Sequence, residues 1–381
     1  MIIKNLTINN LRNHKESLID LDDSINIFYG KNGTGKTTIL EGLSIISISK
    51  SFLPALDSSL IKNGETFFLI SGIGENDLSV PYKVSIRYNG SGRKIINSSL
   101  GDNLLPKNIV GEIPVVILSP DYKVITFGAP QDRRQFLDGV LSQSSKIYIE
   151  EALKLKKLLK QRNSLLSDYQ KNKKIDYRLF ETLSEMFIFS AAEIVSRRSK
   201  FINNFVPYFS SYYQRISDNN EKVSINYKPD SFDDNLFQSI LEKNDIIERY
   251  QSRFESLRDK ELIRGTTLFG PQKDDIEIRI ANKPAKESAS QGQHKTLLLS
   301  IKFAEYEILK NIKNESPIFM LDDIFSELDK ERSYNINKII RELNCQTLIT
   351  ITNRERFDVF DNIETKSAFF RLDNGIVTKE N

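Results

Sequence analysis

The chain of 381 residues lacks the features that would assign it to a secreted, membrane or highly basic class. It has one cysteine, Cys345, so no internal disulfide can form, and a reducing cytosol is the expected compartment. No stretch approaches the ~18 uncharged apolar residues of a membrane span, and the polar N-terminus is not expected to be a signal peptide. The formal net charge is only +3, so affinity for DNA would have to come from local clusters of Lys and Arg. The hydrophobic content of 39% suits one large or two medium globular domains.

Strand and helix patterns predict α/β segments on both sides of a helical segment. Residues 24–30, SINIFYG, have the pattern of a buried strand, and residues 37–51, TTILEGLSIISISKS, that of an apolar helix. Near the C-terminus, residues 317–324, PIFMLDDI, and 346–352, QTLITIT, are further buried strands with a helical pattern between them. Strands that alternate with helices in this way predict a parallel sheet.

Two long helical patterns between these segments predict a helical hairpin with arms of about 30 residues, roughly 45 Å long. The first seam comprises Ala152, Leu155, Leu159, Arg162, Leu166 and Tyr169. The second comprises Phe180, Ser184, Phe187, Ala191, Ile194, Arg198 and Phe201. Residues 146–200 carry 13 Lys and Arg against 7 Asp and Glu. This excess fits a nucleic-acid face and an ordinary solvated helix surface equally well.

A phosphate-binding loop is the clearest motif in the sequence. Residues 30–37 match G-x-x-x-x-G-K-[ST] between the predicted strand and helix. The glycines let backbone N–H groups wrap phosphate oxygens at the positive end of the helix. Lys36 would reach the β and γ phosphates, and Thr37 would offer its hydroxyl to Mg²⁺. The candidate nucleotide-binding residues of this stretch are Gly30, Lys31, Asn32, Gly33, Thr34, Gly35, Lys36, Thr37 and Thr38.

Two acidic residues end the predicted strand PIFMLDDI and supply the other half of such a site. Asp322 would hold Mg²⁺ directly or through water, and Asp323 would orient or activate the attacking water. The alternative interpretation of the pair is a turn or helix cap at a strand end. We therefore take Asp323 and Lys36 as the candidate catalytic residues, and Thr37 and Asp322 as the candidate metal ligands.

A second candidate phosphate-binding segment precedes a long apolar helix. Ser290, Gln291, Gly292 and Gln293 place a hydroxyl and free N–H groups at its positive end, although an ordinary helix cap would have the same composition. The segment resembles the S-G-G-Q signature with which ABC-type ATPases bind the γ-phosphate held by a partner subunit. The stretch 326–329, SELD, follows the acidic pair as the D-loop of that class does. The succession of P-loop, helical insertion, signature, acidic strand and D-loop resembles an ABC-type P-loop ATPase head.

Within that class, four stretches resemble the RecF family of bacterial DNA-repair proteins. Its N-F-R-N-Y segment is similar to NNLRNHKES near the N-terminus, and its S-P-E…G-x-P-x-x-R-R-x-F-L-D segment to residues 118–138. Its Q-R-N-x-L-L segment resembles residues 159–166, and its R-G-x-T-x-x-G-P-H-R-D-D segment resembles residues 264–275. The resemblance implies an α/β fold whose mixed sheet surrounds the P-loop helix, with an inserted helical lobe. We expect an N-terminal ATPase part at 1–118, a helical lobe at 119–263 and a C-terminal ATPase part at 264–381.

The resemblance also implies a function. RecF-like proteins bind duplex DNA and single-strand/duplex junctions when ATP brings two copies together, hydrolyse ATP slowly, and act with RecR and RecO at gapped DNA to help load RecA. It implies ATP and Mg²⁺ as cofactors, Ser290 acting on the nucleotide of a second copy, no membrane partner, and Arg12 and Asn13 near the base or the α-phosphate.

The chain departs from the family pattern at several positions. Thr38 replaces the usual Asn, Leu53 stands where an Arg is usual, and Lys273 keeps a cation in GPQKDD. A switch His is lacking near Thr352 or Asn353, which would fit slow turnover.

Four other classes compete with this interpretation. The hairpin is too short for an SMC-like ATPase. A transporter-associated ATPase would need membrane partners, and its helical insertion lacks the stretch DRRQFLD. A lone P-loop kinase or GTPase has no use for the signature segment. An OLD-type nuclease would need a further acidic domain after residue 352.

Overall fold

The computed structural model describes most of the chain, and the described residues are 1–217, 221–232, 242–327, 330–352 and 367–380. The chain divides into two compact units. The first unit consists of Met1–Lys123, Tyr212–Asn219 and Lys295–Asn381. The second consists of Val124–Ser211 and Asn220–His294. Both ends of the chain therefore belong to the first unit.

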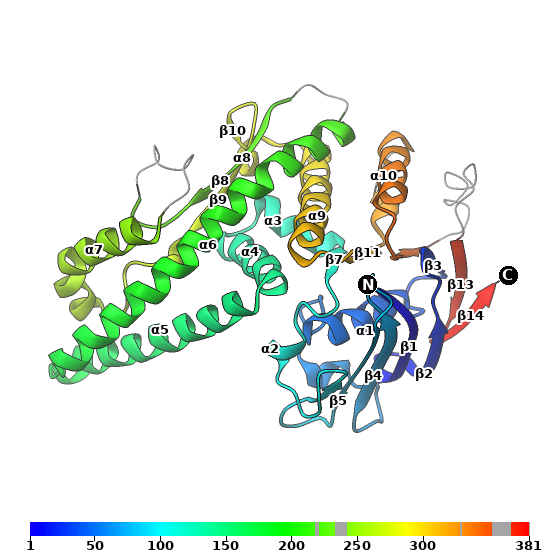
Figure 1. Ribbon diagram of the computed structural model, residues 1–381, viewed down its shortest axis with the longest axis horizontal. Coiled ribbons are helices and arrows are strands. Elements are labelled where there is room, and N and C mark those ends of the chain that lie inside the picture. Colours follow the sequence, from blue (N-terminus) through cyan, green and yellow to red (C-terminus); the bar gives the residue numbers. More distant parts are fainter. Residues whose placement is uncertain (218–220, 233–241, 328–329, 353–366, 381) are drawn as a thin grey trace. The chain divides into compact units, whose positions relative to one another are not determined.

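A six-stranded sheet in the first unit has the order β14-β13-β3-β12-β11-β7. Its strands are β3 (Ile25–Tyr29), β7 (Val115–Leu118), β11 (Ile318–Asp322), β12 (Thr347–Ile351), β13 (Ser367–Asp373) and β14 (Ile376–Glu380). The helices around it are α1 (Lys36–Ile48), α9 (Gln291–Lys313) and α10 (Lys330–Leu343). Every neighbouring pair is parallel except β13 and β14, which confirms the prediction of a parallel sheet. Strands β11 and β12 are buried at every position because α1 covers one face of the sheet and α10 the other (Figure 1).

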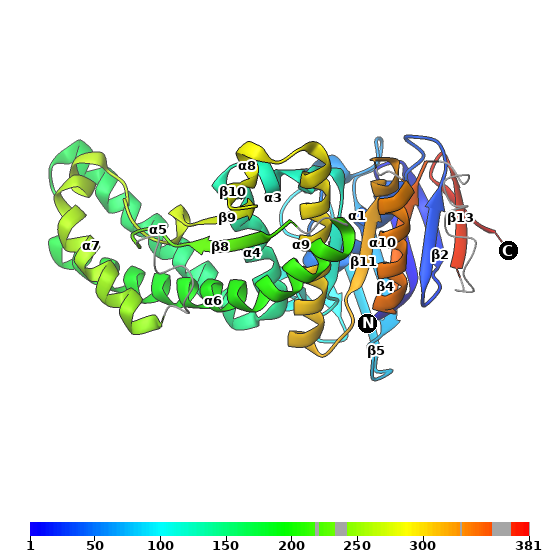
Figure 2. The same cartoon turned by 90° about the horizontal axis from the view of Figure 1, so that it is seen from above.

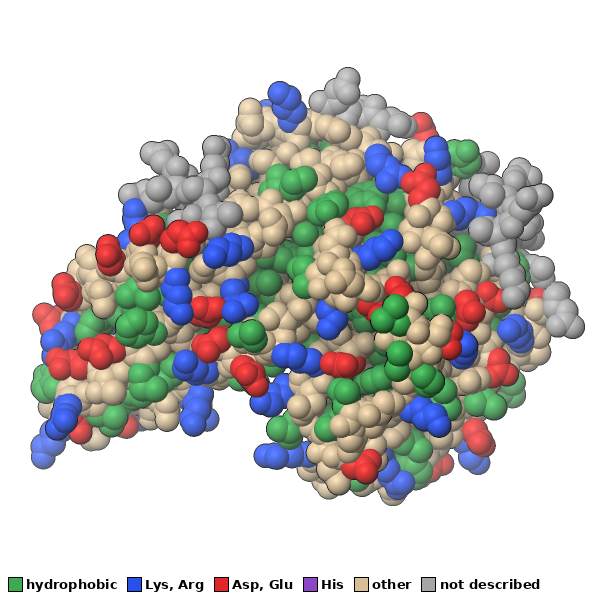
Figure 3. Space-filling model, viewed as in Figure 1, with side chains coloured by type: hydrophobic (Ala, Val, Ile, Leu, Met, Phe, Trp, Pro, Cys, Tyr) green, Lys and Arg blue, Asp and Glu red, His purple; other side chains and the backbone are tan. Residues whose placement is uncertain are grey.

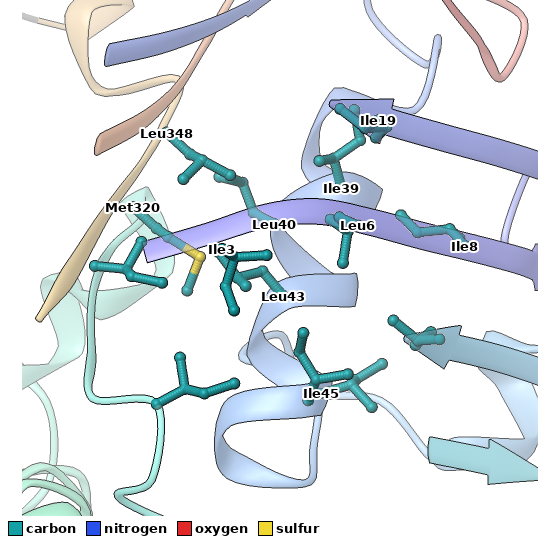
Figure 4. Close-up of a cluster of buried hydrophobic side chains, with 14 of the residues drawn as sticks. Ile3, Leu6, Ile8, Ile19, Ile39, Leu40, Leu43, Ile45, Met320 and Leu348 are labelled. Atoms are coloured by element: carbon teal, nitrogen blue, oxygen red, sulfur yellow. The ribbon is translucent and has the colours of Figure 1, made fainter. Parts of the chain in front are cut away.

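An antiparallel sheet of five strands, in the order β2-β1-β4-β5-β6, completes the first unit. Its strands are β1 (Ile2–Leu11), β2 (His14–Asp20), β4 (Phe68–Glu75), β5 (Pro81–Tyr88) and β6 (Ile95–Ser98). Helix α1 contacts both sheets. Figure 4 shows Leu40 and Leu43 of α1 gathered with Ile3 on β1 and Met320 on β11 in one cluster, and all four are fully buried. The helix after the P-loop is therefore held by apolar burial on two sides, which fixes the position of its N-terminus.

The second unit is mostly helical. Its long helices are α4 (Pro130–Ser144), α5 (Lys146–Asn172), α6 (Tyr177–Ser217) and α7 (Lys243–Arg264), of which α6 ends in the first unit. Helices α5 and α6 form the predicted hairpin, and all seven residues of the second predicted seam are buried. The sequence did not predict α7, which packs against α5 beside the hairpin (Figures 1 and 2). Although α6 has 41 residues, no helix in the described part of the chain is long and apolar enough to cross a membrane.

A small antiparallel sheet in the second unit has the order β10-β9-β8. Its strands are β8 (Val223–Lys228), β9 (Asp275–Ile280) and β10 (Lys283–Pro284). Residues 274–280, DDIEIRI, have the alternating pattern of a strand, and the sequence assigns residues from 264 onward to the ATPase part. In the structure β9 pairs with β8, so the compact units separate after His294 and not before Arg264. A strand pattern predicts the strand but does not identify the sheet it joins.

Candidate nucleotide-binding site

The P-loop connects β3 to α1 and has the backbone geometry that the motif requires. Gly30, Gly33 and Gly35 all have φ between +81° and +155°. A Cβ on Gly30 would lie 2.5 Å from the carbonyl oxygen of Leu372, whereas a Cβ on Gly33 would meet nothing within 4 Å. The loop is therefore held against β13 at one end and open at its tip, where a phosphate would need room.

Lys36 is folded over the loop that precedes it. Its side chain is buried, and its ammonium donates hydrogen bonds to the carbonyls of Gly30 (2.7 Å) and Lys31 (2.9 Å). Burial lowers the pKa of Lys36, while the charges of Asp323 and Asp322 oppose that shift. The cation thus lies at the loop, and the charges of both acidic residues favour its protonated form.

The acidic pair at the end of β11 meets the start of α1. The Thr37 hydroxyl donates to Asp322 Oδ1 at 2.8 Å, and the Thr350 hydroxyl on β12 donates to the same oxygen at 2.8 Å. Burial raises the pKa of Asp322, and the two hydroxyls oppose the shift. Asp323 has a positive φ of 47°, and its N–H donates to the backbone carbonyl (3.2 Å) and hydroxyl (3.0 Å) of Thr350. The sequence did not identify Thr350 as a partner of Asp322. The only sequence signal for it is that a predicted buried strand contains a residue with a hydroxyl group.

Thr37 and Asp322 fit the Mg²⁺ ion that a P-loop motif implies beside its nucleotide. A hydroxyl and a carboxylate, with waters and phosphate oxygens, form the oxygen ligand set that Mg²⁺ prefers. Thr37 and Asp322 provide that hydroxyl and carboxylate in contact with one another. No group of three or more His, Cys, Asp or Glu side chains in the described chain could hold a metal ion by itself. Thr37 and Asp322 therefore suit a Mg²⁺ ion whose other ligands are waters and nucleotide phosphate oxygens.

The turn after β1 lies beside the P-loop. Arg12 forms a bidentate ion pair with Glu41 of α1, at 2.9 and 3.1 Å, and remains 34% exposed. Ser51 also donates to Glu41, at 2.7 Å. The Asn13 amide donates to the Gly33 carbonyl at 3.1 Å, and its own oxygen is buried without a hydrogen-bond partner among the described residues. Sequence reasoning missed Glu41, although a carboxylate within an otherwise apolar helix is a signal for such a partner.

The remaining predicted loop residues differ in exposure. Lys31 and Asn32 are exposed at the tip with Gly33, whereas Thr34 is buried and its hydroxyl donates to the Lys31 carbonyl at 2.9 Å. Thr38 is buried within α1. Thr34 and Thr38 are therefore buried within the protein, and only residues 31–33 form the exposed tip of the loop.

The predicted signature segment lies in the second unit and forms a helix cap. The N–H of Gln293 donates to Ser290 Oγ at 3.2 Å, and the N–H of Ser290 donates to Gln293 Oε1 at 2.8 Å. This reciprocal pair is a capping box, the alternative that the sequence left open. The side chain of Gln293 also donates to Glu221, while Ser290 and Gln291 remain exposed. Of the predicted D-loop, residues 328–329 lie outside the described chain, as does Asn353 near the expected switch position.

Two buried arginines join the RecF-like stretches of the second unit through ion pairs. Arg198 of α6 bonds Asp138 at 2.7 Å and Asp274 at 2.8 Å. Burial raises the pKa of Asp274, and Arg198 opposes the shift. Arg133 forms a bidentate pair with Asp275, at 2.7 and 2.9 Å. The residues that carry the resemblance in 118–138 and 264–275 therefore hold α4, α6 and β9 together.

Comparison with known proteins supports the same family. Residues 1–368 match the family described as AAA ATPase domain. The chain is 35% identical to the DNA replication and repair protein RecF of Chloroherpeton thalassium, over 92% of this chain and 95% of the relative. A solved structure of the recombination mediator protein RecF-ATP in the RecFOR pathway is 28% identical, with a TM-score of 0.89 over 100% of this chain and 98% of that one. An Smc head bound to the C-winged helix domain of ScpA is 14% identical over 100% of this chain and 97% of that one, and its TM-score of 0.55 shows a shared fold. The predicted ABC-type P-loop ATPase head is confirmed.

Proposed function

Because the chain belongs to the RecF family of DNA replication and repair proteins, we propose that it is an ATP-dependent DNA-binding protein of recombinational repair. The observation that carries this proposal is the assembled pair of P-loop and acidic strand, with Thr37 bonded to Asp322, in a chain that matches a RecF protein over 92% of its length. It acts with RecR and RecO at gapped DNA and helps to load RecA. The protein works in the cytoplasm.

The nucleotide roles follow from the geometry of the loop. Lys36 exchanges its bonds to the Gly30 and Lys31 carbonyls for bonds to phosphate oxygens. Thr37 and Asp322 hold Mg²⁺, which neutralises phosphate charge when bound. Asp323 orients the attacking water, and its proximity to Lys36 supports that role. Hydrolysis is slow and resets a switch. Arg12 and Asn13 contact the nucleotide beside the loop tip.

A second copy of the chain completes the site. Ser290 and Gln291 are exposed at the start of α9, where the helix N-terminus and a hydroxyl suit a phosphate oxygen. In an ATP-dependent dimer, each Ser290–Gln293 segment binds the γ-phosphate held by the P-loop of the other copy. ATP thereby joins two copies, and loss of phosphate separates them.

The two compact units correspond to the two lobes of such a clamp. The first unit is the ATPase lobe, because it contains the P-loop and both acidic residues. The second is the helical lobe, whose ion pairs involving Arg198 and Arg133 hold α4, α6 and β9 in a fixed arrangement.

A row of lysines on α5 is the proposed DNA-binding face. Lys156, Lys157 and Lys160 are exposed, and none has a carboxylate partner among the described residues. Lys171 continues the row, about 21 Å beyond Lys157 at helical rise. Figure 3 shows Lys and Arg side chains, with acidic ones between them, along the edge over α5. Cations spaced along a straight helix can contact successive phosphates of a duplex backbone.

Binding to gapped and blunt duplexes with ATP, with ADP and without nucleotide, each at two salt concentrations, tests this function. We expect tighter binding with ATP and a steep fall with salt, because each displaced counterion adds to the slope. Lys36→Met should abolish the ATP dependence. The triple variant Lys156→Glu, Lys157→Glu, Lys160→Glu should weaken DNA binding and reduce its salt slope.

The matched control reverses three exposed cations of α7 in the same unit. Arg253, Lys260 and Arg264 are exposed, but Glu255 and Asp259 lie among them on the same helix. Replacing all three by glutamate changes the net charge as much as the α5 triple variant does, and should weaken DNA binding much less. Equal losses in the two triple variants would show that net charge alone governs binding, and no dependence on ATP in the wild type would refute the function.

A further inference from the structure

The carbonyl groups of the P-loop are held by residues from distant parts of the chain. His14, the first residue of β2, is fully buried, and its Nε2 lies 3.0 Å from the carbonyl oxygen of Gly35. The N–H of Gly375, in the turn between β13 and β14, donates to the carbonyl of Thr34 at 3.1 Å. Neither contact is part of the P-loop motif.

Ser17 connects these two supports. His14 Nδ1 lies 2.7 Å from Ser17 Oγ, and Ser17 Oγ lies 3.2 Å from the Gly375 carbonyl. A closed chain of contacts therefore runs from Gly35 through His14, Ser17 and Gly375 back to Thr34. The turn at Gly375 is also tightly packed, since a Cβ on Gly375 would lie 2.7 Å from the carbonyl oxygen of Asn13.

The protonation state of His14 follows from its neighbours. The Gly35 carbonyl can only accept, so Nε2 must carry the proton. The Ser17 hydroxyl has a single proton, which it donates either to the Gly375 carbonyl or to Nδ1 of a neutral ring. Burial lowers the pKa of His14, and the nearby charge of Lys62 adds to that effect, whereas the bond to Gly35 opposes it. His14 is accordingly neutral at pH 7, with Nε2 as its donor.

Holding a carbonyl also determines where the next N–H group points. In a trans peptide the N–H is directed away from the C=O of the same plane. The carbonyl of Thr34 shares its plane with the N–H of Gly35, and the carbonyl of Gly35 shares its plane with the N–H of Lys36. Fixing these two carbonyls from outside the loop fixes both N–H groups on the other side.

We propose that His14 and the Gly375 turn are positioning elements of the nucleotide site, which aim the Gly35 and Lys36 N–H groups at the phosphates. This inference rests on the proposed binding of nucleotide at the P-loop and adds the residues that preorganise it. Donors that are already aligned need no reorientation when the anion binds, so they contribute more to affinity than mobile donors.

The test compares His14→Phe, which removes the donor and keeps a ring, with His14→Gln, which keeps an N–H donor at a similar reach. Titration with ATP and with ADP gives the dissociation constants, and melting curves give the stability of each variant. We expect His14→Phe to weaken both nucleotides about tenfold, the effect of one lost hydrogen bond to a charged group. His14→Gln should stay within about threefold of the wild type.

Gln346→Leu is the matched control for a purely structural effect. Gln346 is a buried polar residue of the same unit that bonds the backbone of Ile3 and Asp22, away from the P-loop. It should lower the melting temperature without changing nucleotide affinity. If His14→Phe also loses only stability, His14 is a structural residue and the inference is overturned.

Two further measurements keep the inference testable if His14→Phe does not fold. Gly375→Ala should weaken nucleotide binding through displacement of the turn, and wild-type affinity in that variant would contradict the inference. The protein has two histidines, so ¹⁵N spectra of histidine-labelled protein can resolve His14. A neutral ring protonated at Nδ1 would overturn the proposed bond to Gly35. Absence of ATP binding by the wild type would refute the nucleotide site itself, which is a separate outcome.

Discussion

Replacing Arg162 should destabilise the helical hairpin by about 3–5 kcal/mol, the range for breaking a buried ion pair from one side. The guanidinium is fully buried and donates four hydrogen bonds, two to Glu261 (2.5 and 3.1 Å), one to Ser184 (3.0 Å) and one to Thr267 (2.8 Å). In Arg162→Met the Glu261 carboxylate would keep only the Leu268 N–H, at 2.7 Å, as a described partner. An almost unpaired buried charge accounts for most of the expected loss.

The double variant Arg162→Met, Glu261→Leu separates this charge effect from lost packing. Removing both charges should return the stability to within about 2 kcal/mol of the wild type, because desolvation of the pair offsets most of its attraction. The chain has no tryptophan and two compact units, so calorimetry and hydrogen exchange of the α5 and α6 amides are better probes than intrinsic fluorescence. Additive losses in the two single variants would refute the reasoning, as would a loss below 1 kcal/mol in Arg162→Met.

Three further predictions concern the proposed ATP cycle. Asp323→Asn should leave ATP binding intact and retain an ATP-bound dimer, as measured by light scattering, and failure to dimerise would contradict its assigned role. Ser290→Arg should bind ATP normally as a monomer and block the dimer, whereas weak monomer binding would place the serine in its own chain's site. Thr350→Val removes a hydrogen bond that holds down the pKa of Asp322. As pH falls, Mg²⁺-dependent ATP binding should therefore be lost at a higher pH than in the wild type, with Mg²⁺-free ADP binding as the control.

The sequence predicted the parts of the site that depend on local spacing. The P-loop is a continuous run whose glycines and lysine act within one turn of backbone, so its pattern shows its chemistry. The contacts of Thr350 with Asp322 and of Gly375 with Thr34 join residues far apart in the chain. No periodicity or motif connects such pairs, because strand order and turn position decide them.

In the helical unit, too, local spacing was predictable from the sequence and long-range pairing was not. The 3,4-spacing of apolar residues predicted the hairpin and the buried seam of α6, since that spacing places them on one helix face. Of the predicted seam of α5, only Arg162 and Leu166 are buried. The pattern could not show that Arg162 and Arg198, which occupy seam positions, are paired with Glu261 and Asp274 from later segments. A charged residue in a seam predicts a buried partner but does not identify it.

The contrast between buried and exposed cations leads to a final prediction about DNA. Arg133, in one of the RecF-like stretches, is buried and paired with Asp275, so it holds the unit together and is not available to phosphates. Lys156, Lys157 and Lys160 of α5 belong to no ion pair among the described residues that would fix their geometry. Contacts with a phosphate backbone through such side chains depend on charge more than on shape.

Replacing Lys156, Lys157 and Lys160 by arginine should therefore preserve DNA affinity within about twofold and leave the salt slope unchanged, because the number of neutralised phosphates stays the same. Binding isotherms at several salt concentrations measure both quantities, with the glutamate triple variant as the reference for full loss. A large loss in the arginine variant would show that the lysines make contacts of fixed geometry, since arginine and lysine are not interchangeable at such sites. In that case α5 would recognise a specific DNA shape and would not act as a general phosphate-binding face.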